Sequence, residues 1–209
     1  MKLTLIVALL LLLVNPAMAD GIDARGKEIK GYVATSGRHV VMFGLSGSLA
    51  EAAYGYMNEK PEEKAGNCSG TIKQFPGVLC AKKGEGAFEC LIGIDLEKGV
   101  LDGSTDELCE HYGSATQKTA ISAESIYVGD EGMIFALVGD TAKTVYSQIP
   151  MKPVYEKIPT RGCLAGGLVK GFDGLVCLKA KNRYLCDIDI KLAARKIEFI
   201  GEACPERGE

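Results

Sequence analysis

The order of apolar and polar positions predicts the same series of elements twice along the chain. Apolar, β-rich runs at 29–35 and 39–45 flank a Ser-Gly-Arg turn, and similar runs at 125–128 and 133–138 flank Gly-Asp-Glu-Gly. Short runs of this kind separated by turn residues indicate β-hairpins. Each half of the chain is therefore expected to open with two antiparallel strands.

A helix is predicted after each hairpin. Apolar residues there recur at i, i+3, i+4 and i+7, a spacing that places them on one helical face: Ala50, Ala53, Tyr54 and Met57 in the first half, and Ala142, Val145, Tyr146 and Ile149 in the second. Ser48 and Asp140 occupy matching positions just before these helices. Because a short side-chain oxygen can accept a free backbone N–H at a helix start, we expect both residues to act as N-caps.

The remainder of each half predicts a four-stranded antiparallel meander. The expected strands are 70–75, 77–82, 88–96 and 99–103 in the first half, and 168–171, 175–178, 184–190 and 196–200 in the second. Asp173-Gly174 is a strong signal for a tight hairpin turn. The predicted fold class is therefore α+β, with a β-hairpin, one helix and an antiparallel β-meander in each half.

The two halves also share residues at fixed offsets. Phe, Leu, Gly, Ala and Tyr recur in the same places in 43–54 and 135–146. Four cysteines follow each segment, with steps of 12, 10 and 19 residues in the first half and 14, 9 and 18 in the second. They are Cys68, Cys80, Cys90 and Cys109, then Cys163, Cys177, Cys186 and Cys204. We interpret this as a tandem duplication of one small disulfide-stabilised module.

The N-terminal segment has the features of a cleavable, bacterial-type secretory signal. Lys2 precedes an apolar stretch at 3–14, and Ala17-Met18-Ala19 supplies a small-residue cleavage site. The apolar stretch is short for a membrane span, which needs about 20 residues, so we expect no stable membrane insertion. Residue 20 is Asp, so no lipid-modified cysteine is expected. The predicted organisation is a signal peptide at 1–19, a first module at 20–112, a linker at 113–123 and a second module at 124–209, in a periplasmic or secreted protein.

An even number of cysteines in an exported chain favours disulfides. Cys80 and Cys90 lie equally far from a predicted turn, as do Cys177 and Cys186. Opposed residues of antiparallel strands come close enough for a disulfide. Of the three pairings that each set of four allows, we favour Cys80–Cys90 with Cys68–Cys109, and Cys177–Cys186 with Cys163–Cys204. No Cys-x-x-Cys pair occurs and the chain has only two histidines, so no metal site or cofactor is predicted.

The net charge of the chain indicates which class of macromolecule it could bind. Loss of Lys2 with the signal leaves 23 basic against 27 acidic residues, a net charge of −4 in place of −3. Binding to nucleic acid needs a cationic face, and mild acidity argues against it. Net acidity suits a basic protein partner, for example a lysozyme. The expected partner is an unidentified protein or envelope component.

One segment approaches a catalytic motif. Residues 44–48 read Gly-Leu-Ser-Gly-Ser, close to the Gly-x-Ser-x-Gly pattern that exposes a serine nucleophile at a strand-to-helix turn. The corresponding position in the second half is Val138, and the final residue of the motif is Ser48 instead of glycine. We therefore predict no catalytic residues. The alternative is an envelope hydrolase that uses Ser46 with His39 as its base.

Three tyrosines are candidate binding residues. Tyr54 and Tyr146 match between the halves, and their helical spacing favours a place at the rim of the core. Tyr155 lies in a proline-bounded segment at 152–159, whereas the matching 58–67 is charged and has no aromatic residue. The expected function is non-catalytic binding or inhibition of an envelope or extracellular macromolecule, with a purely structural envelope protein as a further alternative.

Two carboxylates, Asp187 and Asp189, flank Ile188 and share one face of a predicted strand. A calcium ion needs about six oxygen ligands, and no carboxylate-rich loop is present to supply them. We interpret both residues as solvated strand charges.

Overall fold

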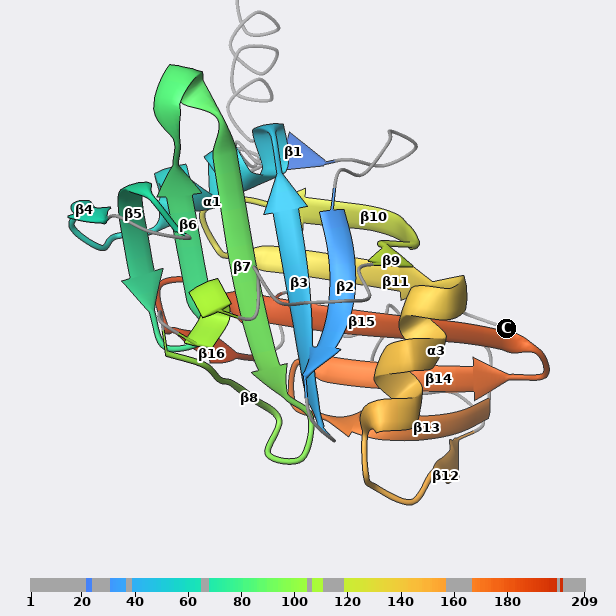
Figure 1. Ribbon diagram of the computed structural model, residues 1–209. Coiled ribbons are helices and arrows are strands. Elements are labelled where there is room, and N and C mark those ends of the chain that lie inside the picture. The colour runs from blue at the N-terminus through green and yellow to red at the C-terminus, as the bar shows by residue number, and fades with distance from the viewer. Residues whose placement is uncertain are drawn as a thin grey trace, which may run out of the picture.

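The computed structural model describes residues 22–23, 31–36, 39–64, 68–104, 107–110, 119–156, 167–198 and 200. Within these ranges the chain forms two eight-stranded sheets, two longer α-helices and a short helical segment at 107–110 (Figure 1). The predicted signal peptide lies outside the described residues, as do Cys163 and Cys204. No helix among the described residues combines the length and apolar character of a membrane span.

The first sheet has the strand order β4-β5-β6-β7-β3-β2-β9, with β8 paired to β7. Every adjacent pair in it is antiparallel. Its strands are β2 (Gly31–Ser36), β3 (Val40–Ser46), β4 (Glu62–Lys64), β5 (Gly70–Phe75), β6 (Val78–Lys82), β7 (Phe88–Asp95), β8 (Val100–Leu101) and β9 (Thr119–Ala120).

The second sheet has the order β1-β10-β11-β15-β14-β13-β12, with β16 paired to β15. Read from its other end, this is the order of the first sheet. Its strands are β1 (Ile22–Asp23), β10 (Ala123–Val128), β11 (Met133–Val138), β12 (Val154–Glu156), β13 (Gly167–Phe172), β14 (Leu175–Ala180), β15 (Arg183–Lys191) and β16 (Lys196–Ile197). The predicted hairpins and meanders are present, and the fold is α+β.

The helices are α1 (Ser48–Tyr56) and α3 (Gly139–Gln148), each placed after the second strand of a hairpin. The predicted N-caps are wrong: the capping positions are Gly47 and Val138, and neither provides a side-chain hydrogen bond. Ser48 is already the first helical residue, and Asp140 is the second of α3. The reason is that the chain turns sharply at a glycine with positive φ before or at the start of each helix, 69° at Gly47 and 59° at Gly139. The helix therefore begins one residue earlier than predicted in α1 and two residues earlier in α3.

The two sheets exchange their first strands. β1 precedes β2 in the chain but pairs with β10, placing Ile22 opposite Val128 in the second sheet. Conversely, β9 precedes β10 but pairs with β2, placing Thr119 opposite Val33 in the first sheet. The segment 113–123, expected to be a linker, thus contributes a strand to the first sheet. The second sheet is therefore completed by β1, which precedes the first half, and the first sheet by β9, which precedes the second half.

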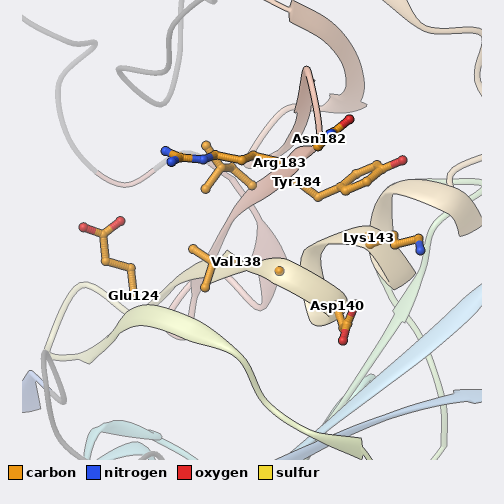
Figure 2. A pocket seen from close by; sticks show the side chains of 9 residues that line it. Glu124, Val138, Asp140, Lys143, Asn182, Arg183 and Tyr184 are labelled. Carbon is orange, nitrogen blue, oxygen red and sulfur yellow. The ribbon is translucent and has the colours of Figure 1, made fainter.

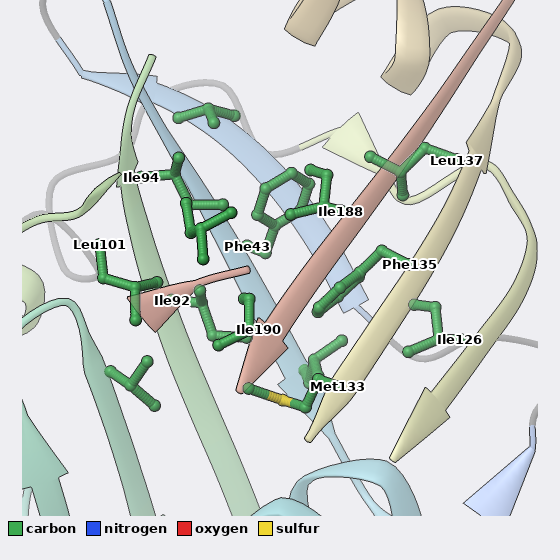
Figure 3. Close-up of a cluster of buried hydrophobic side chains, with 14 of the residues drawn as sticks. Phe43, Ile92, Ile94, Leu101, Ile126, Met133, Phe135, Leu137, Ile188 and Ile190 are labelled. Atoms are coloured by element: carbon green, nitrogen blue, oxygen red, sulfur yellow. The ribbon is translucent and has the colours of Figure 1, made fainter. Parts of the chain in front are cut away.

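The sheets face one another across a shared apolar core. In Figure 1 the strands of the first sheet, blue to green, run across those of the second, yellow to red. Figure 3 shows side chains from both sheets meeting between them. The rings of Phe43 and Phe135, both fully buried, lie at the centre with their centroids 5.4 Å apart. A shared core of this kind makes one folding unit of the two halves.

Three disulfides join described cysteines: Cys68–Cys109, Cys80–Cys90 and Cys177–Cys186. These are the partners favoured from the sequence, and the fourth predicted pair, Cys163–Cys204, lies outside the described residues. Cys80 and Cys90 are directly opposite on β6 and β7, and Cys177 and Cys186 on β14 and β15, each pair with Cα atoms 4.0 Å apart. Both cross-strand disulfides lie in the shared core.

Candidate binding surface

Exposed apolar side chains gather at one edge of the second sheet. Five large hydrophobic residues are exposed among the described residues, and four of them lie on β12, on β13 or just before β12. They are Met151 (43% exposed), Val154 (62%), Tyr155 (69%) and Leu168 (37%), and we call them the β12 edge patch. Single exposed apolar residues are ordinary, but a cluster of them marks an interaction surface.

The register of the strands sets the shape of this patch. β12 is the last strand of the second sheet, and Tyr155 lies opposite Leu168 on β13. Directly opposed residues share a sheet face, so Tyr155 and Leu168 form one apolar pair. Val154, one residue earlier, points to the other face. The edge strand is therefore apolar on both faces, at the lower end of the sheet in Figure 1.

The matching edge of the first sheet has a different character. There β4 consists of Glu62, Glu63 and Lys64, and the pair corresponding to Tyr155 and Leu168 is Glu63 and Thr71. The Thr71 hydroxyl donates to Glu63 Oε1 over 2.6 Å. Charged residues on an edge strand oppose the addition of another strand. One edge of the molecule is thus protected by charge, and the other is open and apolar.

Lysine and aromatic side chains continue the patch across the second sheet. Leu168 lies opposite Lys179 on β14, which lies opposite Tyr184 on β15. Lys179 Nζ is 5.6 Å from the centroid of the Tyr184 ring. The Tyr184 ring in turn meets that of Tyr146 edge-on, with centroids 5.4 Å apart. A row of side chains therefore leads from the sheet edge to helix α3.

Tyr54 and Tyr146 occupy equivalent places on helices α1 and α3. Lys73 Nζ lies 4.8 Å from the Tyr54 ring centroid, and Lys170 Nζ lies 4.9 Å from that of Tyr146. Burial raises the pKa of both phenols. Tyr146 is only 8% exposed. Both rings are engaged inside the molecule, which leaves Tyr155 as the tyrosine, of the three candidates, that is available to a partner.

Beside this row is a pocket of about 510 Å³ (Figure 2). It lies between the corner where β11 joins α3 and the hairpin that joins β14 to β15. Its charged lining residues are Glu124, Asp140, Lys143 and Arg183, and Tyr184 connects it to the row described above. Carboxylates and cations line the same hollow, and no ion pair joins any two of these four side chains. The pocket thus adds positively and negatively charged groups to the surface that begins at the apolar edge.

The interpretation of Asp187 and Asp189 as solvated charges is wrong. Asp189 is only 4% exposed, and its Oδ2 accepts a hydrogen bond of 2.8 Å from the backbone N–H of Ile200. Burial, with added repulsion from Asp189 and Glu124, raises the pKa of Asp187 to about 6. The two carboxylates do share one face of β15, as predicted, but this face is covered at Asp189 and partly buried at Asp187.

The structure separates Ser46 from His39. His39 directly precedes β3 and Ser46 ends it, so at about 3.3 Å per residue their backbones stand roughly 23 Å apart. His39 Nδ1 instead lies 2.9 Å from the carbonyl oxygen of Gln148, at the end of α3. A base must lie within hydrogen-bond reach of its nucleophile, so His39 cannot activate Ser46 in this fold.

Sequence reasoning singled out Tyr155 but missed Leu168, Val154 and Met151. A three-residue strand gives too short a pattern to be recognised, and no strand was predicted in the proline-bounded segment at 152–159. The usable signal was the contrast between the apolar 154–155 and the acidic 62–63 at the same place in each half.

Comparison of the chain with protein-family models, with curated proteins and with solved structures found no match. The function must therefore be inferred from the surface of this molecule and from its sequence. On that surface, the β12 edge patch is a group of apolar residues that are exposed and so do not contribute to the stability of the core.

Proposed function

We propose that the protein is a non-catalytic binding protein of the periplasm or extracellular space that holds a protein or envelope component at its β12 edge patch. The observation that carries this proposal is the grouping of four of the five exposed large hydrophobic residues at one sheet edge. Keeping such residues in water has a cost of about 25 cal/mol for each Å² of apolar surface, and a partner that covers them recovers it.

The chemistry of the patch suits binding. Tyrosine is enriched among the residues that dominate binding energy, since it combines a large apolar ring with a polar end. The strands behind Tyr155 are fixed by the Cys177–Cys186 disulfide and by the shared core. A rigid surface loses little conformational freedom on association, which favours affinity.

The proposal includes the origin and compartment of the chain. Matching strand order, matching cysteines and paired glycine turns support a tandem duplication of one module. The signal-like N-terminus and the disulfides support export to an oxidising compartment. The β4 and β12 edges then represent two copies of one edge that diverged. The β4 edge retained charges that oppose strand addition, and the β12 edge acquired apolar residues that contact a partner.

Site-specific photo-crosslinking in the cells that express the protein tests this function. A photo-reactive phenylalanine analogue replaces Tyr155 in one strain and Glu63, its counterpart on β4, in another. We expect discrete adducts from position 155 and none from position 63. Equal labelling at both positions, or no adduct at position 155, would overturn the proposal.

A further inference from the structure

The outer side of β12 is not paired with any strand among the described residues. β12 ends the second sheet, and its partner β13 occupies its inner side only. In a strand, the N–H and C=O groups of alternate residues point to opposite edges. β12 therefore presents backbone donors and acceptors outward, beside the exposed side chains of Val154 and Tyr155.

On the basis of the proposed function, we propose that the partner inserts an extended segment that adds to β12 as a further strand, with apolar side chains alternating with carboxylates. Strand addition to a free sheet edge is an established mode of peptide recognition, in which backbone hydrogen bonds supply affinity and alternate side chains supply specificity. Because the side chains of a strand alternate between its faces, the apolar residues would lie against Tyr155 and Leu168, and the carboxylates would lie on the opposite face, which carries Val154.

The charges near the edge select a carboxylate-bearing segment. Lys152 is exposed just before β12, and Lys179 lies on the row that begins at Tyr155. Two strand spacings of about 4.8 Å put Lys179 roughly 10 Å from β12, within the range over which charges act at moderate salt. β12 itself contains one acidic residue, Glu156. The two lysines near the patch therefore outnumber its one acidic residue, although the whole chain is net acidic.

The same charges argue against the other edge and against a second copy of this chain. An acidic segment at β4 would meet Glu62 and Glu63, both exposed, and like charges across a strand pair destabilise it. Pairing of β12 with β12 of another copy would bring two sets of lysines together. Charge complementarity thus assigns the acidic, apolar segment to β12 of a single molecule.

Fluorescence anisotropy with defined peptides tests this inference on the whole chain from residue 20 onward. The probe is a labelled eight-residue peptide in which valine or tyrosine alternates with aspartate. One comparison peptide replaces aspartate by lysine, and another carries N-methyl groups on alternate backbone nitrogens, which removes the strand donors. The protein variants are Tyr155→Glu and, as the matched control, Val100→Glu, because Val100 is the fifth exposed hydrophobic residue and lies away from this edge.

We expect the aspartate peptide to bind and the lysine peptide to bind about tenfold more weakly, with the difference shrinking as salt rises. N-methylation and Tyr155→Glu should each weaken binding by about tenfold or more, whereas Val100→Glu should have no effect. Tyr155 is 69% exposed, so its substitution leaves the core intact.

Three results would overturn strand addition: equal binding of the N-methylated peptide, preference for the lysine peptide, or binding of no peptide. Sedimentation that shows a dimer disrupted by Tyr155→Glu would assign the edge to a second copy and also overturn it. If crosslinking at position 155 persists while the peptides fail, the binding function stands and only the strand mechanism falls. If position 155 gives no crosslink and no peptide binds, both proposals are wrong.

Discussion

The rings of Phe43 and Phe135 pack against each other at a centroid distance of 5.4 Å, one from β3 and the other from β11. The two residues occupy the same place in the two halves of the sequence, 92 positions apart. Each is fully buried. Residues at the same place in the two halves therefore meet at the centre of the core, where the two sheets stabilise one another (Figure 3).

Replacement of Phe135 should destabilise both sheets at once. Phe135→Ala removes a buried ring and leaves a cavity at the contact between the sheets, so we expect a loss of about 3–5 kcal/mol in the free energy of unfolding. Urea unfolding followed by tyrosine fluorescence and by far-UV circular dichroism measures it. The two probes should give one coincident transition, and two separate transitions would contradict a shared core.

Removal of β1 should weaken the second sheet. Deleting residues 20–23 takes away the partner of Tyr127 and Val128 on β10. A two-residue ladder contributes about one or two backbone hydrogen bonds, so the expected loss is roughly 1–3 kcal/mol. Thermal unfolding of this chain is compared with that of a chain lacking only residues 20 and 21. Equal stability of the two truncated chains would show that the exchanged strand contributes nothing.

Lys73 and Lys170 should stabilise the protein equally. Lys73 Nζ donates to the carbonyl oxygens of Tyr54 and Met57, and Lys170 Nζ donates to those of Tyr146 and Ile149, over 2.7–3.3 Å. A cation at a helix C-terminus also interacts favourably with the helix dipole.

We therefore expect Lys73→Met and Lys170→Met each to cost about 1–3 kcal/mol. Chemical denaturation gives the values, with Lys152→Met as the control because Lys152 is exposed. A large cost for one lysine and none for the other would contradict their structural equivalence.

Asp187 should make stability depend on pH. Its pKa is about 6 in the folded protein, above the ordinary 3.8, so the folded state holds this proton more tightly than the unfolded state does. The stabilisation from protonated Asp187 is fully present below pH about 4 and is lost as the pH rises through about 6.

Asp187→Asn should prevent the loss of stability that follows deprotonation of Asp187. At about 1.4 kcal/mol for each unit of pKa difference, the variant should be more stable than the natural chain by about 1–3 kcal/mol at pH 7.5. The two chains should become equally stable near pH 4. Denaturation curves at several pH values measure the difference, and a constant difference across this range would show that Asp187 does not titrate as stated.

The elements were predictable because each has a strong local cause. The glycine turns and alternating apolar residues of the meanders located β5 to β7 and β13 to β15 nearly to the residue. The helices followed from apolar residues at helical spacing. Equal distances from a turn identified the cross-strand pairs Cys80–Cys90 and Cys177–Cys186.

The relations between the halves were not predictable in this way. Nothing local in residues 22–23 or 119–120 indicates which hairpin they will join, since two-residue strands carry no periodicity of their own. The burial of Asp189 depends on the N–H of Ile200, which arrives from a later part of the chain. The binding patch required knowledge of which strand ends the sheet, and only the topology supplies it.

The exchange of β1 and β9 also sets an order of events in synthesis. Ile22 finds its partner only when Val128, 106 residues later, has been made. At about 5–20 residues per second, that interval lasts roughly 5–20 seconds. Throughout it, the first hairpin lacks β9 and the N-terminal strand lacks β10. The pairing of β1 with β10 therefore forms only after more than half of the chain has been made.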